Sequence, residues 1–256
     1  MISLLMPSLV TPEAPPVPPA ASTPFPTTAW SCVRQAQDTT HPRYVAAVNR
    51  LIAAYWRPVF HFLRAKGRSV ADAEDLTQEF FVRFLAKGWL GRADPGRGRF
   101  RAFLKTLVGR FATVRTDRAR NQDRFEKQFV AVSSLMRDED RSYEPAAGEA
   151  PDEAFDRQWK QDVLATVRRH LREHYEGSSD PEQQKRYAIF AAYHLADQAK
   201  EQPTRHALAA RFGVSLEAIR YALEQVKKKY ERLLRQEVRD QVGSEEEVEA
   251  ELHGLA

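Results

Sequence analysis

The spacing of its apolar residues is the feature that most constrains the fold of this chain. They recur every three or four positions over long stretches, and no stretch alternates apolar and polar residues as a half-buried strand would. The first such stripe consists of Val45, Val48, Leu51, Ile52, Tyr55, Val59, Phe62 and Leu63. Pro58 is expected to begin a second helical segment, because proline disrupts a helix interior. The pattern predicts an all-α fold.

Capping residues and glycines divide the rest of the chain into further helices. Ser69 and Asp72 approximate a capping box and predict a helix over 70–87. Residues 88–98 contain four glycines and predict a loop, after which a stripe from Phe100 to Phe111 predicts a helix of about five turns. More helices are expected at 155–176, 182–200 and 204–240.

Composition suggests two small helical domains joined by an irregular acidic linker. A chain of 256 residues with 43% hydrophobic content suits two cores better than one. Eight of the fifteen prolines fall between Pro7 and Pro26, so residues 1–26 are expected to be a disordered leader. The predicted parts that follow are a first domain at 27–125, a linker at 126–154, a second domain at 155–240 and an acidic tail at 241–256.

Charge is distributed unevenly along the chain and suggests a polyanionic partner. The net charge is only +4, but residues 97–120 hold eight Arg or Lys and one Asp, and residues 244–256 hold five Glu and no Arg or Lys. The alternative is an ordinary solvated basic face. A lone Cys32, a poor signal peptide and the lack of a long apolar run lead us to expect a cytoplasmic protein without membrane association.

Residues 205–224 fit a helix-turn-helix template. Ala209 is small where two helices would touch, Gly213 stands where the turn needs a positive φ, and Ile219 would point into the core. An ordinary helical hairpin is the alternative. If the helix-turn-helix binds DNA, its outward or flanking candidates are Arg205, Ser215, Glu217, Arg220, Tyr221, Glu224, Lys227 and Lys228.

Asp72, Asp75 and Glu79 lie three and four residues apart and share one face of the predicted helix over 70–87. Such a face could hold Mg²⁺ beside a phosphate, but no second acidic helix completes the cage. The face could instead be merely solvated, or could dock a basic partner helix. We therefore expect no enzyme, no metal site and no cofactor.

Residues 72–81 closely resemble region 2.2 of the extracytoplasmic-function group of sigma factors, within the sigma-70 family of bacterial RNA polymerase. Residues 98–104 resemble region 2.3, and the segment from 205 resembles region 4.2. Segments similar to one subgroup of these factors occur at 25–30, 55–56, 117–120, 155–159 and 247–252. The resemblance covers about residues 25–253.

The resemblance implies an alternative sigma factor that directs core polymerase to promoters and helps to open them. It implies core-polymerase contacts at Asp72, Asp75, Leu76, Gln78, Glu79 and Arg83. Arg and Lys residues also flank the apolar stripe from Phe100 to Phe111, where they could follow DNA phosphates. With the resemblance they imply minus-ten DNA contacts at Trp89, Arg99, Arg101, Lys105, Arg110, Arg115 and Arg118. The helix-turn-helix candidates would contact the minus-thirty-five element. An anti-sigma factor, a regulatory kinase, or the acidic tail acting on the basic helix could regulate it.

The chain departs from the group's pattern at several positions. Arg110 and Val114 stand where region 2.4 usually has Asn and Asp, and Ala222 and Gln225 stand where region 4.2 often has Arg. The promoter sequence is therefore expected to be atypical. The main alternative function is a stand-alone helix-turn-helix regulator.

The aromatic residues around the basic helix divide into two kinds. Phe100, Phe103 and Phe111 repeat with helical spacing, which predicts core packing rather than base stacking. Trp89 lies in the predicted loop, where it could stack on an unpaired base or anchor the loop.

Overall fold

The computed structural model describes residues 30–113, 137–195, 202–239 and 245–255. Within these residues every regular element is helical and there is no strand, which confirms the all-α prediction. The predicted leader, Arg115, Arg118 and residues 126–136 of the predicted linker lie outside the described residues. No helix among the described residues combines the length and apolar character needed to cross a membrane.

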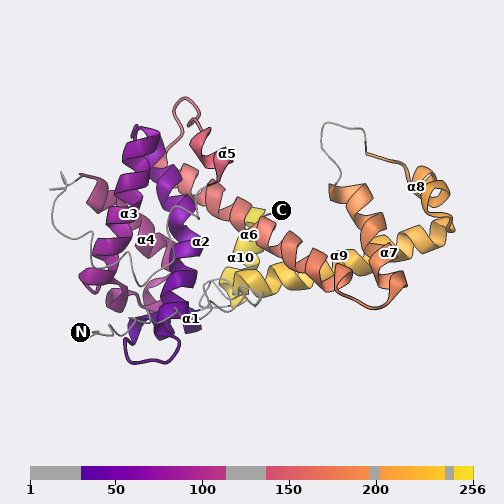
Figure 1. The fold of residues 1–256 in the computed structure, drawn as a ribbon, viewed down its shortest axis with the longest axis horizontal. Coiled ribbons are helices and arrows are strands. Elements are labelled where there is room, and N and C mark those ends of the chain that lie inside the picture. Colours follow the sequence, from indigo (N-terminus) through magenta and orange to yellow (C-terminus); the bar gives the residue numbers. More distant parts are fainter. Residues whose placement is uncertain (1–29, 114–136, 196–201, 240–244, 256) are drawn as a thin grey trace, which may run out of the picture.

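The first lobe is built around helix α2 (Tyr44–Ala65), with α1 (Trp30–Gln37), α3 (Val70–Ala86) and α4 (Phe100–Thr113) packed around it (Figure 1). Large aromatic side chains fill its centre, including the fully buried Tyr55, Trp56, Phe60, Phe80 and Phe100. Phe100 and Phe111 are buried and Phe103 packs against the same cluster. The prediction that these three phenylalanines belong to the core is confirmed.

Pro58 does not begin a new segment, so that prediction was wrong: α2 runs through it without a break. An interior proline loses one backbone hydrogen bond and costs about 3 kcal/mol. Tyr55, Trp56, Val59 and Phe60 on both sides of it are fully buried. Burying large apolar side chains yields about 1.5–3 kcal/mol each, so packing outweighs the proline penalty.

The start of α3 follows the capping prediction. The Ser69 hydroxyl oxygen accepts a hydrogen bond from the Asp72 backbone N–H at 3.1 Å and donates one to the Asp72 carboxylate at 2.7 Å. The following loop contains two short 3₁₀ turns, η1 (Trp89–Arg92) and η2 (Pro95–Arg97). The Gln37 amide donates to the carbonyl oxygens of Leu90 and Ala93 at 3.0 and 2.8 Å, which ties the loop to α1.

The described part of the predicted linker is folded onto the first lobe. Residues 138–141 form the short helix α5 (Asp138–Arg141), and α6 (Pro151–Glu176) begins before the expected position 155. Phe155, Trp159 and Val163 of α6 are buried in the same cluster as α2 and α4. Acidic composition suggests a solvated segment, but the Asp140 carboxylate is buried and paired with the buried Arg57.

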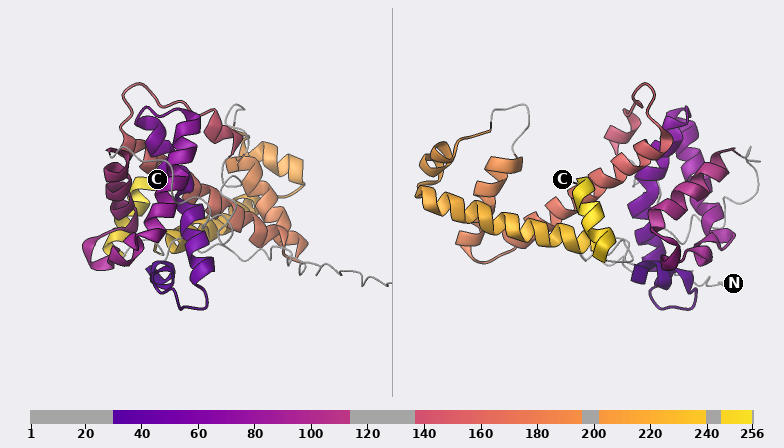
Figure 2. Two further views of the ribbon diagram at one scale, coloured as in Figure 1. Left: turned by 60° about the vertical axis from the view of Figure 1, so that its left-hand side comes forward. Right: turned by 180° about the vertical axis from the view of Figure 1, so that it is seen from behind.

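The second lobe contains the far half of α6, α7 (Pro181–Phe190), a π-helical turn (Ala191–Leu195), α8 (Arg205–Phe212) and the long α9 (Leu216–Arg239). Leu171 and Tyr175 of α6 belong to its core. Helix α6 thus contributes to both cores, while α9 runs back beside it toward the first lobe (Figures 1 and 2). The last helix, α10 (Glu245–Leu255), packs against the end of α9.

Candidate nucleic-acid interface

Helices α8 and α9 meet at a tight turn whose residues suit their positions. Thr204 caps α8 by accepting from the Ala207 N–H, and Ser215 caps α9 by accepting from the Ala218 N–H, each at 3.2 Å. Gly213 ends α8 with φ +63°, a conformation that favours glycine, as the template required. The two helices are thereby held at a fixed angle by local sequence.

One face of α9 packs inward and the other is open. Leu208 of α8 and Ile219, Ala222 and Val226 of α9 are buried in the second core. All eight predicted DNA-contact side chains of this lobe are exposed: Arg205, Ser215, Glu217, Arg220, Tyr221, Glu224, Lys227 and Lys228. The structure therefore leaves each of the predicted contact residues of this lobe accessible to a partner.

Tyr221 is the notable side chain of this surface, because large hydrophobic residues are rarely left exposed. It is 51% exposed, and the guanidinium of Arg186 on α7 lies 5.3 Å from its ring centroid. Glu224, which would repel a phosphate, is paired with Lys228 at 2.6 Å. Sequence reasoning missed Arg186, because only the fold brings α7 beside α9.

The acidic face of α3 lies on the outside of the first lobe. Asp72 and Asp75 are exposed, while Leu76, Gln78, Glu79 and Arg83 are half-buried. Glu79 pairs with Arg83 at 2.6 Å along the helix, and Glu74 lies 3.7 Å from Arg141 of α5. Within the described residues, no three His, Cys, Asp or Glu side chains gather so as to hold a metal ion.

Three of the predicted minus-ten contacts, on α4 and at the residue just before it, already pair with carboxylates. We call Arg99, Arg101 and Lys105 the basic cluster. Lys105 donates to Asp156 of α6 at 2.7 Å, and Arg99 and Arg101 both pair with Glu251 of α10. Arg110, by contrast, is exposed. In this conformation the basic cluster faces the protein's own carboxylates.

Trp89 lies in η1, as expected for the loop, and is half-buried. Its ring packs against the first core, with its centroid 6.4 Å from that of Phe80, and Lys87 lies 5.8 Å from it. This packing favours the anchor interpretation of Trp89 over base stacking.

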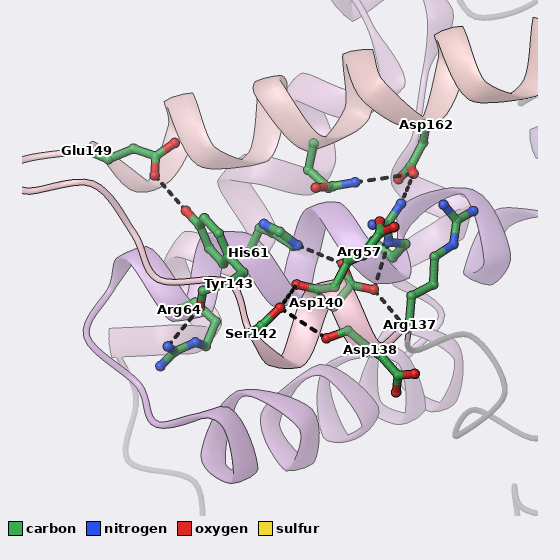
Figure 3. A network of polar contacts seen from close by, with 12 residues as sticks. Arg57, His61, Arg64, Arg137, Asp138, Asp140, Ser142, Tyr143, Glu149 and Asp162 are labelled. Atoms are coloured by element: carbon green, nitrogen blue, oxygen red, sulfur yellow. Dashed lines mark hydrogen bonds and ion pairs between the residues drawn. The ribbon is translucent and has the colours of Figure 1, made fainter. Parts of the chain in front are cut away.

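A buried polar network that sequence reasoning missed fixes α5 to α2 (Figure 3). The Asp140 carboxylate is fully buried, accepts from the Arg57 guanidinium at 2.8 and 2.9 Å and lies 2.9 Å from His61 Nε2. Arg57 also pairs with Asp162 of α6. The one available signal was the spacing of Arg57, His61 and Arg64 on the otherwise apolar second half of α2.

The pKa values within the network follow from this geometry. Burial alone would raise the pKa of the Asp140 carboxyl, but hydrogen bonds from His61 and Arg57 outweigh it and hold that pKa well below its usual value. Burial lowers the pKa of His61, so its neutral ring donates through Nε2. Burial raises the pKa of Asp162, with Arg57 opposing. The network therefore carries one buried, fully ionised carboxylate.

A second set of contacts closes the segment between α5 and α6 over α2. The Tyr143 hydroxyl donates to Glu149 at 2.6 Å, and burial together with this bond raises the pKa of Tyr143 to about 12. The Tyr143 ring stacks on His61, with centroids 4.1 Å apart. Arg64 donates to the Tyr143 carbonyl oxygen at 3.0 Å. The segment is held at several points rather than free.

Comparison with known proteins finds one similarity, which covers part of the chain. A family model described as sigma-70 region 2 matches residues 51–124, which include most of α2 and all of α3 and α4. No curated protein and no solved structure matches the chain. Over these residues the chain is similar to region 2 of sigma-70 factors, which are non-enzymatic transcription initiation factors that bind core RNA polymerase and promoter DNA.

Proposed function

We propose that this chain is an alternative sigma factor of the extracytoplasmic-function group, which directs core RNA polymerase to specific promoters and assists their opening. The observation that carries the proposal is the order of surfaces along the chain. The region 2 match is followed, in the second lobe, by a capped pair of helices with eight exposed polar or aromatic side chains on α8 and α9. With the region 2 match alone and no exposed α8–α9 surface after it, the proposal would name only a protein with a sigma-70 region 2 domain.

In this proposal the chain positions DNA and polymerase, and catalysis belongs to the polymerase. The acidic face of α3 docks on the core enzyme, and the basic cluster with Arg110 holds the phosphates of the opened minus-ten strand. Each cation that contacts a phosphate releases counterions, so DNA affinity should fall steeply with salt. Arg220 and Tyr221 on α9 are the foremost candidates for reading bases of the minus-thirty-five element.

The direct test is reconstitution with core polymerase. We expect promoter-specific run-off transcripts only when the purified chain and core are mixed. A stand-alone helix-turn-helix regulator, the alternative favoured by the α8 and α9 geometry alone, would bind an operator and ignore core. Failure of the chain to bind core would contradict our proposal.

Reversing charge on the acidic face should weaken core binding. We expect Asp75→Lys with Glu79→Lys to lower core affinity about tenfold or more, because like charges would meet a basic partner surface. Fluorescence titration with labelled core would measure this. Glu173→Lys with Glu176→Lys, an equal reversal on the exposed end of α6, is the matched control and should have no effect. An equal loss of core affinity in the two double variants would mean that the acidic face of α3 has no specific role in binding core.

Removing one base-facing cation should affect DNA recognition alone. We expect Arg220→Ala to weaken binding to promoter DNA about tenfold, since a good bidentate base contact is worth about 1–3 kcal/mol. Gel-shift titration of polymerase holoenzyme on duplex promoter DNA would measure it. Arg232→Ala, which removes an exposed arginine farther along α9, is the control. An unchanged promoter affinity would remove Arg220 from the reading surface.

A further inference from the structure

Helix α10 places a carboxylate on the basic cluster of α4. Glu251 is only 4% exposed, and its Oε1 lies 2.6 Å from Arg101 Nη2 while also pairing with Arg99. Two guanidinium groups that converge on one carboxylate oxygen form the arrangement that also recognises a phosphate oxygen. Glu251 therefore occupies the position at which a nucleic-acid phosphate would bind these two arginines.

The two carboxylates on the basic cluster differ in how firmly they are attached. Asp156, 2.7 Å from Lys105 and 3.5 Å from Arg101, lies on α6 between residues that build the first core. The Arg101 guanidinium also lies 4.2 Å from the centroid of the Trp159 ring on the same helix. These contacts are part of the folded lobe. Glu251 instead lies on α10, none of whose described residues is a buried member of either core.

The attachment of α10 is small enough to be reversible. Its described contacts are the packing of Val248, Leu252 and Leu255 with Val238 and Leu234 at the end of α9, of Leu255 with the first core, a Lys160 hydrogen bond to the Gly254 carbonyl oxygen at 2.7 Å, the Arg235–Glu249 pair at 2.6 Å, and the pairs of Glu251 with Arg99 and Arg101. An eleven-residue helix is marginal when isolated. Ion pairs that must give up their hydration contribute little net stability. Undocking therefore exposes Val248, the one buried apolar side chain among those described on α10, and leaves the buried residues of both cores in place.

We propose that α10 is an autoinhibitory element that competes with nucleic acid for Arg99 and Arg101. This inference rests on the proposed function, because the competitor is the phosphate backbone of the promoter strand. With α10 docked, the two arginines cannot bind DNA. The apparent DNA affinity is therefore the intrinsic affinity multiplied by the fraction of molecules in which α10 is released. Docked α10 also joins the end of α9 to the first lobe and so restrains both DNA-binding surfaces at once.

The test compares two isosteric neutralisations on the same helix in the full chain. Glu251→Gln removes the charge on the basic cluster, and Glu249→Gln removes a 55% exposed charge that pairs with Arg235 instead. Binding is measured by fluorescence anisotropy of a labelled single-stranded oligonucleotide at low salt. We expect Glu251→Gln to bind about tenfold more tightly than the parent chain and Glu249→Gln to bind like the parent.

Hydrogen exchange of the peptide spanning 248–255 gives a second readout that needs no DNA. We expect faster exchange in Glu251→Gln, because α10 is released more often. A lower melting temperature without tighter DNA binding would overturn the proposal and make α10 a structural tail. Tighter DNA binding by Glu251→Gln without any transcription on core polymerase would keep the autoinhibitory contact and reject the sigma function.

Discussion

Replacing Asp140 by alanine is expected to lower the free energy of unfolding by about 3 kcal/mol or more. The substitution leaves Arg57 largely buried with Asp162 as its one remaining carboxylate in the network and leaves the buried His61 without its acceptor. Removing one partner of a buried ion pair costs about 3–5 kcal/mol, because the other charge stays buried. Urea denaturation followed by circular dichroism would measure the change.

A neighbouring carboxylate supplies the control for this prediction. Asp138 lies two residues away on α5 and is exposed, so Asp138→Ala should change stability by less than about 0.5 kcal/mol. Equal losses for the two variants would show that the network contributes nothing beyond local helix charge.

The same network predicts how stability depends on pH. Because the folded pKa of Asp140 lies below its unfolded value, its contribution is complete above about pH 4 and is lost as the pH falls toward the folded pKa. The stability difference between the parent chain and Asp140→Asn should therefore shrink below about pH 4. A difference that grew on acidification would contradict the assigned pKa direction.

A fragment ending at residue 125 should fail to fold cooperatively. That boundary, which composition suggested, removes Phe155, Trp159 and Val163 from the first core and takes away Asp140. At about 1.5–3 kcal/mol for each of the three buried side chains, the loss is about 4.5–9 kcal/mol, comparable with the whole stability of a small domain. Thermal melting by near-ultraviolet circular dichroism would show no cooperative transition.

The longer fragment 27–168 is the matched comparison, because it keeps α5 and the first half of α6. We expect it to melt cooperatively and to retain the aromatic signal of a packed core. If the fragment 27–125 melted with the same midpoint, α6 would be an accessory helix and the boundary drawn from composition would be right.

Local features of this fold could be predicted from the sequence because local chemistry determines them. The Ser69 cap, the glycine turn at Gly213 and the stripe from Phe100 to Phe111 each depend on residues within a few positions of one another. The exposed face of α9 followed from the same helical periodicity. These are the features for which sequence and structure agree.

Long-range pairings could not be predicted in the same way. Asp140 belongs to a segment that is acidic by composition, and only the fold brings it within reach of Arg57, 83 positions away. The basic cluster was assigned to DNA because its periodicity left those cations outward, but outward residues can still meet Glu251 from a distant helix. Composition gives the charge of a segment but not the residues with which its charged side chains pair in the fold.

Helix α6 is one uninterrupted helix with its first half in one core and its second half in the other. Its 26 residues extend over about 39 Å, and each residue advances the chain by about 100° around the helix axis. The number of α6 residues between the two cores therefore sets both the distance between the lobes and the angle of one lobe relative to the other around the helix axis. One residue inserted between Val163 and Leu171 would swing the α8–α9 surface by more than a quarter turn around the axis, whereas seven would lengthen the spacer and nearly restore its heading.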